Sequence, residues 1–263
     1  MSIWKLELME TLHEIADEES QEPWDNGGIQ VDVGTLEINR ILVALEVTTE
    51  VIQEANELAV DYIVVHHPLI FQPLSEIDAN EVVGHLVVEL IQSGIGVYAS
   101  HTAFDKVKGG NNDYMAELLD LVMTRPLLSM ENEYLGVRGQ LKESLTLDAL
   151  CGNLGKALAM DIHDFRIIGS LDKTIRNLGI IVGSGGSYVR DAIYNGCDVL
   201  ITGDVKYHDA QLAKEAGISV VDAGHYGTEK SFVENMTEKL KEKISVKAEI
   251  IPSKLMINPF TKL

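Results

Sequence analysis

The sequence predicts an α/β fold of two domains with mostly parallel or mixed sheets, in which the second domain interrupts the first. Short apolar runs alternate with helical patterns along the chain, as in sheets covered by helices on both faces. The character of the sequence changes around Thr124-Arg125-Pro126. Histidine-bearing segments follow expected strands both early and late in the chain, so distant segments are expected to share one domain.

The first part of the chain carries the clearest alternation of strands and helices. Apolar residues recur at helical spacing over 3–18, which predicts an amphipathic first helix. Thr48 or Thr49 is suited to cap a helix that runs to about Ala59, because a threonine oxygen accepts a hydrogen bond from a free N–H at a helix start. A further helix is expected over 80–93, and the expected strands cover 41–45, 62–65 and 95–100.

The rest of the chain predicts a second α/β unit and then a return to the first. Its expected strands cover 135–142, 164–171, 177–182, 198–202 and 218–222, and its expected helices cover 146–159, 186–195 and 228–243. His225 and Glu229 must join His66 and Asp105 if all four bind one centre. We therefore expect a discontinuous metal-binding domain formed by 1–125 and 220–263, with 126–219 inserted as a second α/β domain.

Composition limits the possible partners and compartment. The formal charge is -20, from 41 acidic and 21 basic residues, which makes nucleic-acid binding through phosphate neutralisation improbable. No apolar run approaches the roughly 20 residues that span a bilayer, and the N-terminal segment is acidic and amphipathic, so we expect neither a membrane span nor an export signal. Only Cys151 and Cys197 occur, without Cys-x-x-Cys spacing, which fits a reducing cytoplasm.

Five of the eight histidines fall in four short segments, each at or beyond the end of an expected strand. These segments are His66-His67-Pro68, His101-Thr102-Ala103-Phe104-Asp105, Tyr207-His208-Asp209 and His225-Tyr226-Gly227-Thr228-Glu229. Ligand crevices of open α/β sheets lie beyond the carboxyl ends of the strands. Imidazole and carboxylate together suit zinc, manganese, iron, nickel or cobalt, so a metal site with nitrogen and oxygen ligands is the first hypothesis.

Each segment also has a structural alternative. One histidine of the His66-His67 pair could simply be a hydrogen-bonded polar residue at a strand end, and Asp105 could cap the turn after its strand. Glu229 could be a first-turn carboxylate that the helix dipole favours. His208 is equally suited to be a ligand, a proton carrier or a residue at a helix N-terminus. His13, His85 and His163 lack partners at matching spacing and are expected in ordinary positions.

Two glycine-rich segments can each be interpreted as a ligand-binding loop or as a tight turn. Gly183-Ser184-Gly185-Gly186-Ser187 lies between an expected strand and helix, where backbone N–H groups could hold a phosphate. It lacks the full Gly-x-Gly-x-x-Gly pattern and a Walker lysine, so a tight turn is favoured. Gly109-Gly110-Asn111-Asn112-Asp113 likewise favours a turn with a helix cap.

Taken together, five motifs resemble those of the Nif-three-like dinuclear-metal hexameric family, whose members are often called GTP cyclohydrolase 1 type 2 homologues. Four of them lie in Asp25–Gln30, His66–Phe71, Ser100–Asp105 and Thr202–His208, and the fifth is Gly224–Glu229. They occur in the family's order over essentially the whole chain. Gly27 stands where a branched or other apolar residue is frequent in the family, a difference that affects a turn and no ligand.

The resemblance implies two α/β domains, a hexameric ring and two metal ions per subunit. The implied ligands are His66, His67, Asp105, His225 and Glu229, and His101 and His208 match the family's additional site histidines. The implied activity is metal-dependent hydrolysis of a nucleotide or related heterocycle, of the GTP cyclohydrolase kind, in which His101 or His208 carries a proton. The alternative is a non-catalytic metal-binding scaffold or metal-delivery protein with protein partners.

Overall fold

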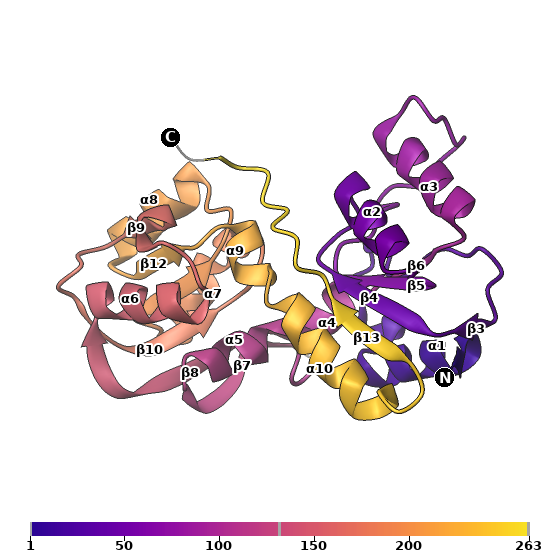
Figure 1. Ribbon diagram of the computed structural model, residues 1–263. Coiled ribbons are helices and arrows are strands. Elements are labelled where there is room, and N and C mark those ends of the chain that lie inside the picture. Colours follow the sequence, from indigo (N-terminus) through magenta and orange to yellow (C-terminus); the bar gives the residue numbers. More distant parts are fainter. Residues whose placement is uncertain (1, 131–132, 262–263) are drawn as a thin grey trace. The chain divides into compact units, whose positions relative to one another are not determined.

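The computed structural model describes residues 2–130 and 133–261 and divides into two compact units (Figure 1). Unit 1 comprises 1–107 and 232–263, and unit 2 comprises 108–231. The sequence places the boundaries near 125 and 220 instead. Unit 2 begins earlier because the strand from Val122 pairs within its sheet, and it ends later because it includes His225 and Glu229. The independence of the two predicted domains stays a prediction.

Unit 1 is built on a five-stranded sheet with the order β13-β4-β5-β6-β2. Its strands are β2 (Gly28–Val31), β4 (Arg40–Ala44), β5 (Tyr62–Val65), β6 (Gly96–Ala99) and β13 (Glu249–Pro252). All neighbours are parallel except β2, which runs antiparallel to β6. The three central strands are buried except at Arg40, which is typical of parallel strands covered on both faces.

Helices cover both faces of this sheet (Figure 1). On one face, α2 (Thr49–Glu57) and α3 (Val82–Ser93) pack their apolar residues against the even-numbered residues of β4 and the odd-numbered residues of β5 and β6. On the other face lie α1 (Lys5–Ile15) and α10 (Phe232–Ile244). Thr48 caps α2 by accepting from the Val51 N–H, as expected from the sequence.

Short elements complete unit 1. The first helix is shorter than predicted, because Ile3 and Trp4 form β1, which pairs with β3 (Glu37–Ile38). A one-turn helix, α4 (Thr102–Lys106), follows β6 directly, and a 3-10 helix covers Glu18–Ser20. These segments bring residues of the turn before β2 against the end of β6.

Unit 2 contains a six-stranded mixed sheet with the order β7-β8-β10-β11-β12-β9. The strands are β7 (Val122–Met130), β8 (Glu133–Thr146), β9 (Arg166–Ile168), β10 (Thr174–Ile180), β11 (Val199–Thr202) and β12 (Ser219–Asp222). The neighbours β10, β11 and β12 are parallel, and the remaining pairs are antiparallel. The two sheets confirm the predicted α/β class with mixed and mostly parallel pairing.

Two layers of helices flank the second sheet. One layer contains α5 (Asn111–Leu118) and α6 (Leu147–Ala157), whose buried residues share a core with β8, β10 and β11. The other contains α7 (Val189–Tyr194) and α8 (Tyr207–Ala216), which pack against Leu200 and Val220. Two 3-10 helices, Ile162–Asp164 and Gly186–Tyr188, precede β9 and α7.

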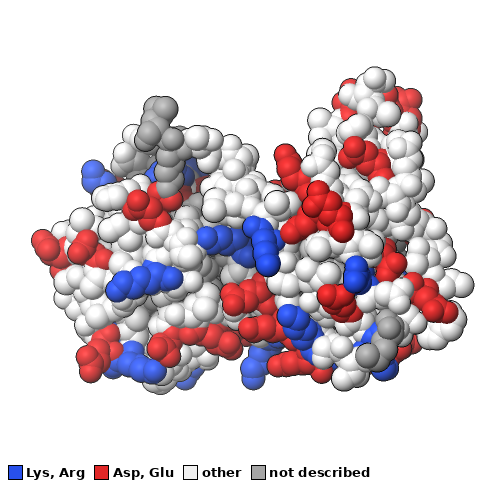
Figure 2. All heavy atoms as spheres, viewed as in Figure 1, with Lys and Arg blue, Asp and Glu red and all other residues white. Residues whose placement is uncertain are grey.

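One predicted helix is wrong in its extent. The helix expected over 228–243 is two helices, α9 (His225–Glu229) and α10, separated at Lys230 and Ser231. The stripe of Phe232, Met236 and Leu240 belongs to α10 alone and is fully buried. No helix in the described part of the chain is long and apolar enough to cross a membrane. Acidic side chains are spread over the viewed face of each unit (Figure 2), in keeping with the net charge of -20.

Candidate metal centre

Two adjacent histidines end the central strand of unit 1. The backbone N–H groups of His66 and His67 both donate to the Leu45 carbonyl at 3.0 Å, so the chain turns as it leaves β5. This turn brings the two imidazole rings to a centroid distance of 5.1 Å, although adjacent residues on a regular strand point to opposite faces. The His66 ring is completely buried and packs on Phe232 at 4.9 Å.

A third imidazole completes a cluster in the same unit. The His101 ring lies 5.1 Å from His66 and 5.6 Å from His67, from centroid to centroid. One nitrogen from each of the three rings lies within 4.8 Å of the others, a spacing that a single divalent ion can bridge. His101 is therefore placed as well for metal binding as for the proton transfer expected from the sequence.

Asp105 reaches the same cluster from α4. Its Oδ2 lies 3.5 Å from His66 Nε2. The other ring nitrogen, His66 Nδ1, lies 2.9 Å from the Ser100 carbonyl oxygen, which only accepts, so Nδ1 carries the hydrogen. This tautomer leaves the Nε2 lone pair directed toward Asp105. A fixed Nδ1–H on a backbone carbonyl is the usual support of a metal-binding histidine.

Asp25 orients His101, a role that sequence reasoning missed. Its side chain is completely buried, and Oδ1 lies 2.8 Å from His101 Nδ1. The second oxygen, Oδ2, accepts from the Thr102 backbone N–H at 3.0 Å and from the Thr102 hydroxyl. The sequence signal was present, since Asp25 opens the motif Asp25–Gln30, but a turn explained the residue equally well.

These contacts keep Asp25 ionised. Burial disfavours the charged carboxylate, but the hydrogen bonds from His101 and Thr102 outweigh it and lower the pKa of Asp25 to about 2. An ionised Asp25 accepts the His101 Nδ1–H and leaves Nε2 of His101 as a lone-pair donor. Such a nitrogen binds a metal ion or accepts a proton.

Unit 2 carries a second group of donors around His225. Its Nε2 lies 2.9 Å from Glu229 Oε2, one turn along α9, and its Nδ1 lies 2.7 Å from Asp204 Oδ2. Glu229 is almost completely buried, whereas Asp204 is exposed and has a positive φ of 52°. Asp204 is a second orienting carboxylate that the sequence analysis did not assign.

Two carboxylates on one imidazole favour its protonated form. The hydrogen bond with Glu229, opposed by burial and reinforced by Asp204, raises the pKa of His225 to about 9. The protein without metal therefore holds an imidazolium at neutral pH, with its Nε2 proton facing Glu229. A divalent ion bound by Nε2 and Glu229 would replace that proton.

The glycine-rich segment after β10 packs on this pair. Gly183 has a φ of +66°, and a Cβ there would lie 2.1 Å from Glu229 Oε1 and 3.5 Å from His225 Nε2. Its N–H donates to the Thr228 hydroxyl at 2.9 Å. This close approach explains why residue 183 is a glycine, and the explanation requires no bound phosphate. It agrees with the tight turn that the sequence favours.

The structure does not bring His208 into these groups. His208 is exposed at the start of α8 and contacts the Tyr207 ring at 5.4 Å. It belongs to none of the side-chain groups able to hold a metal within the described residues. His13 and His85 lie on α1 and α3, each with a carboxylate four residues on, as ordinary surface histidines do.

Each unit by itself offers donors that suit a divalent transition metal. In unit 1 these are three imidazoles and the Asp105 carboxylate, and in unit 2 they are His225 and Glu229. Zinc, iron, manganese, nickel and cobalt all accept such mixed nitrogen and oxygen ligands. The orienting partners Ser100, Asp25 and Asp204 fix ring directions before any ion binds.

Comparisons with known proteins cover nearly the whole chain. The sequence profile described as Duf34/NIF3 (NGG1p interacting factor 3) matches residues 5–259. A Clostridium perfringens protein named GTP cyclohydrolase 1 type 2 homolog is 34% identical over 258 residues, or 97% of each chain. A Helicobacter pylori protein named GTP cyclohydrolase 1 type 2 is 34% identical over 86% of this chain and 87% of its own.

Solved structures share the fold. A Bacillus cereus protein related to NIF3 superposes with a TM-score of 0.93 over 100% of this chain and 99% of its own, at 24% identity. A Staphylococcus aureus hypothetical protein gives a TM-score of 0.90 over 100% of both chains, at 26% identity. The two-unit α/β architecture is therefore shared along the full chain.

Proposed function

The chain belongs to the Duf34/NIF3 family, and on that premise we propose that it binds two divalent ions and hydrolyses a nucleotide or related heterocycle. The observation that carries this proposal is the cluster of His66, His67 and His101 at strand ends in unit 1, with Asp105 of α4 beside His66. Relatives named GTP cyclohydrolase 1 type 2 suggest GTP as the first substrate to test.

The proposed ligands are His66, His67, Asp105, His225 and Glu229. The family resemblance supports this set of five for two ions that each need four to six donors. Glu229 is the proposed bridging ligand, since its carboxylate has two oxygens and only one of them faces His225. Two paired divalent ions would activate a water molecule and polarise the bond that it attacks.

His101 is the proposed proton carrier. Opening a guanine ring requires a proton at the leaving nitrogen, and an imidazole provides it near neutral pH. Asp25 holds Nδ1 of His101, which leaves Nε2 to take up and release the proton. His208 is proposed as a second proton carrier on resemblance alone.

The second candidate function is a metal-binding scaffold or metal-delivery protein with protein partners. The family description, NGG1p interacting factor 3, refers to a protein interaction and favours this alternative. In the first function the metal centre is catalytic, and in the second it only binds metal. A measurement of substrate turnover distinguishes the two. In either case the protein is proposed to work in the cytoplasm, where the free thiols of Cys151 and Cys197 stay reduced.

Formate release from GTP by metal-loaded protein tests the enzymatic proposal. His101→Ala should lower turnover by about 10²–10⁴-fold and leave the metal content nearly intact, because its proposed role is proton transfer. Glu229→Gln should reduce the bound metal itself. The control is His85→Ala, which removes an exposed histidine of α3 and should change neither readout. Two bound ions without turnover above a metal-only blank, and no effect of His101→Ala, would favour the scaffold.

A further inference from the structure

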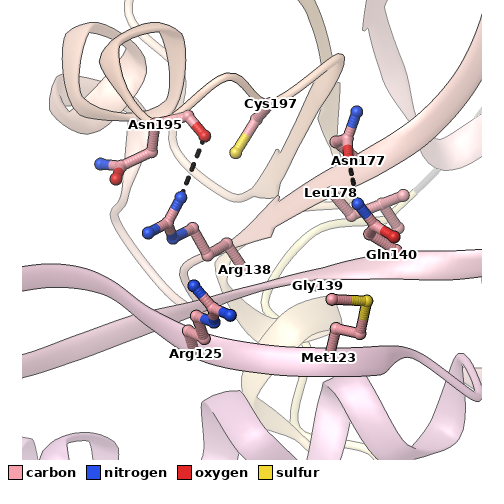
Figure 3. A pocket seen from close by; sticks show the side chains of 9 residues that line it. All are labelled: Met123, Arg125, Arg138, Gly139, Gln140, Asn177, Leu178, Asn195 and Cys197. Atoms are coloured by element: carbon pink, nitrogen blue, oxygen red, sulfur yellow. Dashed lines mark hydrogen bonds between the residues drawn. The ribbon is translucent and has the colours of Figure 1, made fainter.

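A polar cavity lies in unit 2, formed by β7, β8 and β10 with the turn after α7 (Figure 3). Its volume is about 160 Å³. Arg125 and Arg138 line it together with Gln140, Asn177, Asn195 and Cys197. The cavity has two cationic side chains and no carboxylate among its lining residues, in a chain whose net charge is -20.

The two arginines face each other across adjacent strands. Arg125 on β7 is the direct register partner of Arg138 on β8. Figure 3 shows the Arg125 guanidinium directed toward that of Arg138. Within the described part of the chain neither forms an ion pair with a carboxylate. Like charges placed directly opposite in a sheet are destabilising, so the isolated unit carries an unbalanced repulsion here.

A bulge places Arg125 opposite Arg138. Between Val122 and Arg125 the β7 strand has one residue more than the β8 segment from Gln140 to Arg138. The bulge contains Met123, whose φ of 54° lies in the left-handed region that a bulky side chain rarely adopts. Opposite it, a Cβ on Gly139 would lie 3.2 Å from three atoms of β7 and Leu121. Bulges are frequent where a strand redirects a functional side chain.

The hydrogen-bond inventory leaves donors for a ligand. Arg138 donates through Nη1 to the Asn195 carbonyl at 3.2 Å, whereas its buried Nε has no protein partner. Gln140 donates to Asn177 Oδ1 at 3.0 Å. Burial raises the pKa of the Cys197 thiol to about 11, so this side chain supplies no balancing negative charge at neutral pH.

We propose that this cavity binds a small dianionic oxyanion of the phosphate type between Arg125 and Arg138. Two guanidinium groups are balanced by one dianion, and their planar N–H groups match phosphate oxygens. The volume of about 160 Å³ is below the roughly 300–1,000 Å³ of sites for drug-sized ligands and equals about five water volumes. This volume matches an inorganic oxyanion with a few waters.

Calorimetric titration of the full-length protein with inorganic phosphate tests this site. Phosphate should bind to the wild type, and Arg125→Gln should weaken binding by at least about tenfold, since the variant loses a charge-assisted hydrogen bond to the anion. Arg125 is exposed, so this variant should fold even if Arg138→Gln does not. The matched control is Arg176→Gln, an exposed arginine of the same sheet outside the cavity lining, which should bind as the wild type does. Acetate, a monoanion, should bind more weakly than phosphate.

Three results would overturn the proposal. These are no phosphate binding at millimolar concentration, equal losses in Arg125→Gln and Arg176→Gln, and binding that is unchanged in Arg125→Gln. The last would place the phosphate at another site, such as the proposed metal centre. Light scattering on the same variants completes the test. If Arg125→Gln changes the oligomeric state whether or not phosphate is present, the proposal is wrong, and the cavity binds an acidic group of a second copy of the chain.

Discussion

Orienting carboxylates are the main feature of the site at the scale of single residues. Asp25 and Asp204 each hold Nδ1 of a histidine, at 2.8 Å and 2.7 Å. Neither was assigned to the site from the sequence, because Asp25 lies 76 positions from His101 and Asp204 lies 21 from His225. Spacing along the chain predicts metal donors at strand ends. It does not predict which carboxylate binds the other ring nitrogen of each histidine.

Asp25 should make the stability of the metal-free protein depend on acid pH. Its pKa falls from 3.8 to about 2 on folding, so its contribution is complete above pH 4 and is lost as the pH falls toward 2. The contribution is roughly 2 kcal/mol, from about 1.4 kcal/mol per pKa unit for this buried carboxylate.

Urea unfolding of wild type and Asp25→Asn at several pH values measures this effect. The difference in free energy of unfolding between the two proteins should be constant from pH 7 to 4 and should shrink between pH 4 and 2. The exposed Asp120→Asn provides the control, with no such narrowing. A difference that stays constant down to pH 2 would contradict the assigned role of Asp25.

His225 should release a proton when an ion binds. Its pKa is raised from 6.5 to about 9, so the ring is protonated at pH 7 and must lose that proton to bind a metal. Apparent affinity for zinc should therefore rise with pH until about pH 9. Without metal, the stability from the charged ring is complete below pH 6.5 and is lost as the pH rises through about 9.

Calorimetry in buffers of different ionisation enthalpy counts the protons released. Asp204→Asn should reduce the number at about pH 9, where the wild-type ring is about half protonated, because removing one carboxylate lowers the pKa of His225. Asparagine tolerates the positive φ of this position, so the backbone should be unaffected. The same number of protons from both proteins would show that another group is titrating.

At the scale of elements, close packing between the glycine-rich segment after β10 and α9 fixes the position of Glu229. Gly183→Ala should displace Glu229, because the new Cβ would lie 2.1 Å from Oε1, and should lower the metal content. The matched control is Gly196→Ala, where φ is +71° and no atom lies within 4 Å of the added Cβ. Both variants carry the backbone cost of roughly 1 kcal/mol for a left-handed residue, and only Gly183→Ala has the clash. Equal metal content in the two variants, measured by elemental analysis, would refute the packing argument.

The elements that sequence periodicity predicts best are the buried parallel strands. β4, β5 and β6 were expected from short apolar runs, and their ends correctly locate His66 and His101. Strands β2, β7 and β13 were missed, because their formation depends on partners far along the chain. Strand β2 is an antiparallel edge strand, β7 contains Pro126, and β13 is the edge strand at the other side of the first sheet. The break between α9 and α10 was missed too, since the apolar stripe lies wholly within α10 and does not mark where that helix begins.

At the scale of the whole molecule, the family implies assembly into a ring. We expect a hexamer, with six chains of 28.9 kDa each, on resemblance alone. Light scattering coupled to gel filtration at micromolar concentration should give about six times the chain mass. A stable monomer or dimer would mean that the assembly does not extend to this protein. If a chelator alone dissociates the hexamer, the assembly depends on the bound metal.

The central claim is that each chain holds two divalent ions, and elemental analysis of gently purified protein tests it most directly. We predict about two ions per wild-type chain and a loss of most metal in the double variant His66→Ala, His67→Ala. That variant should keep its circular dichroism spectrum, since both residues lie beyond the end of β5. Wild-type protein without bound metal after reconstitution, or a double variant that retains two ions per chain, would contradict the claim.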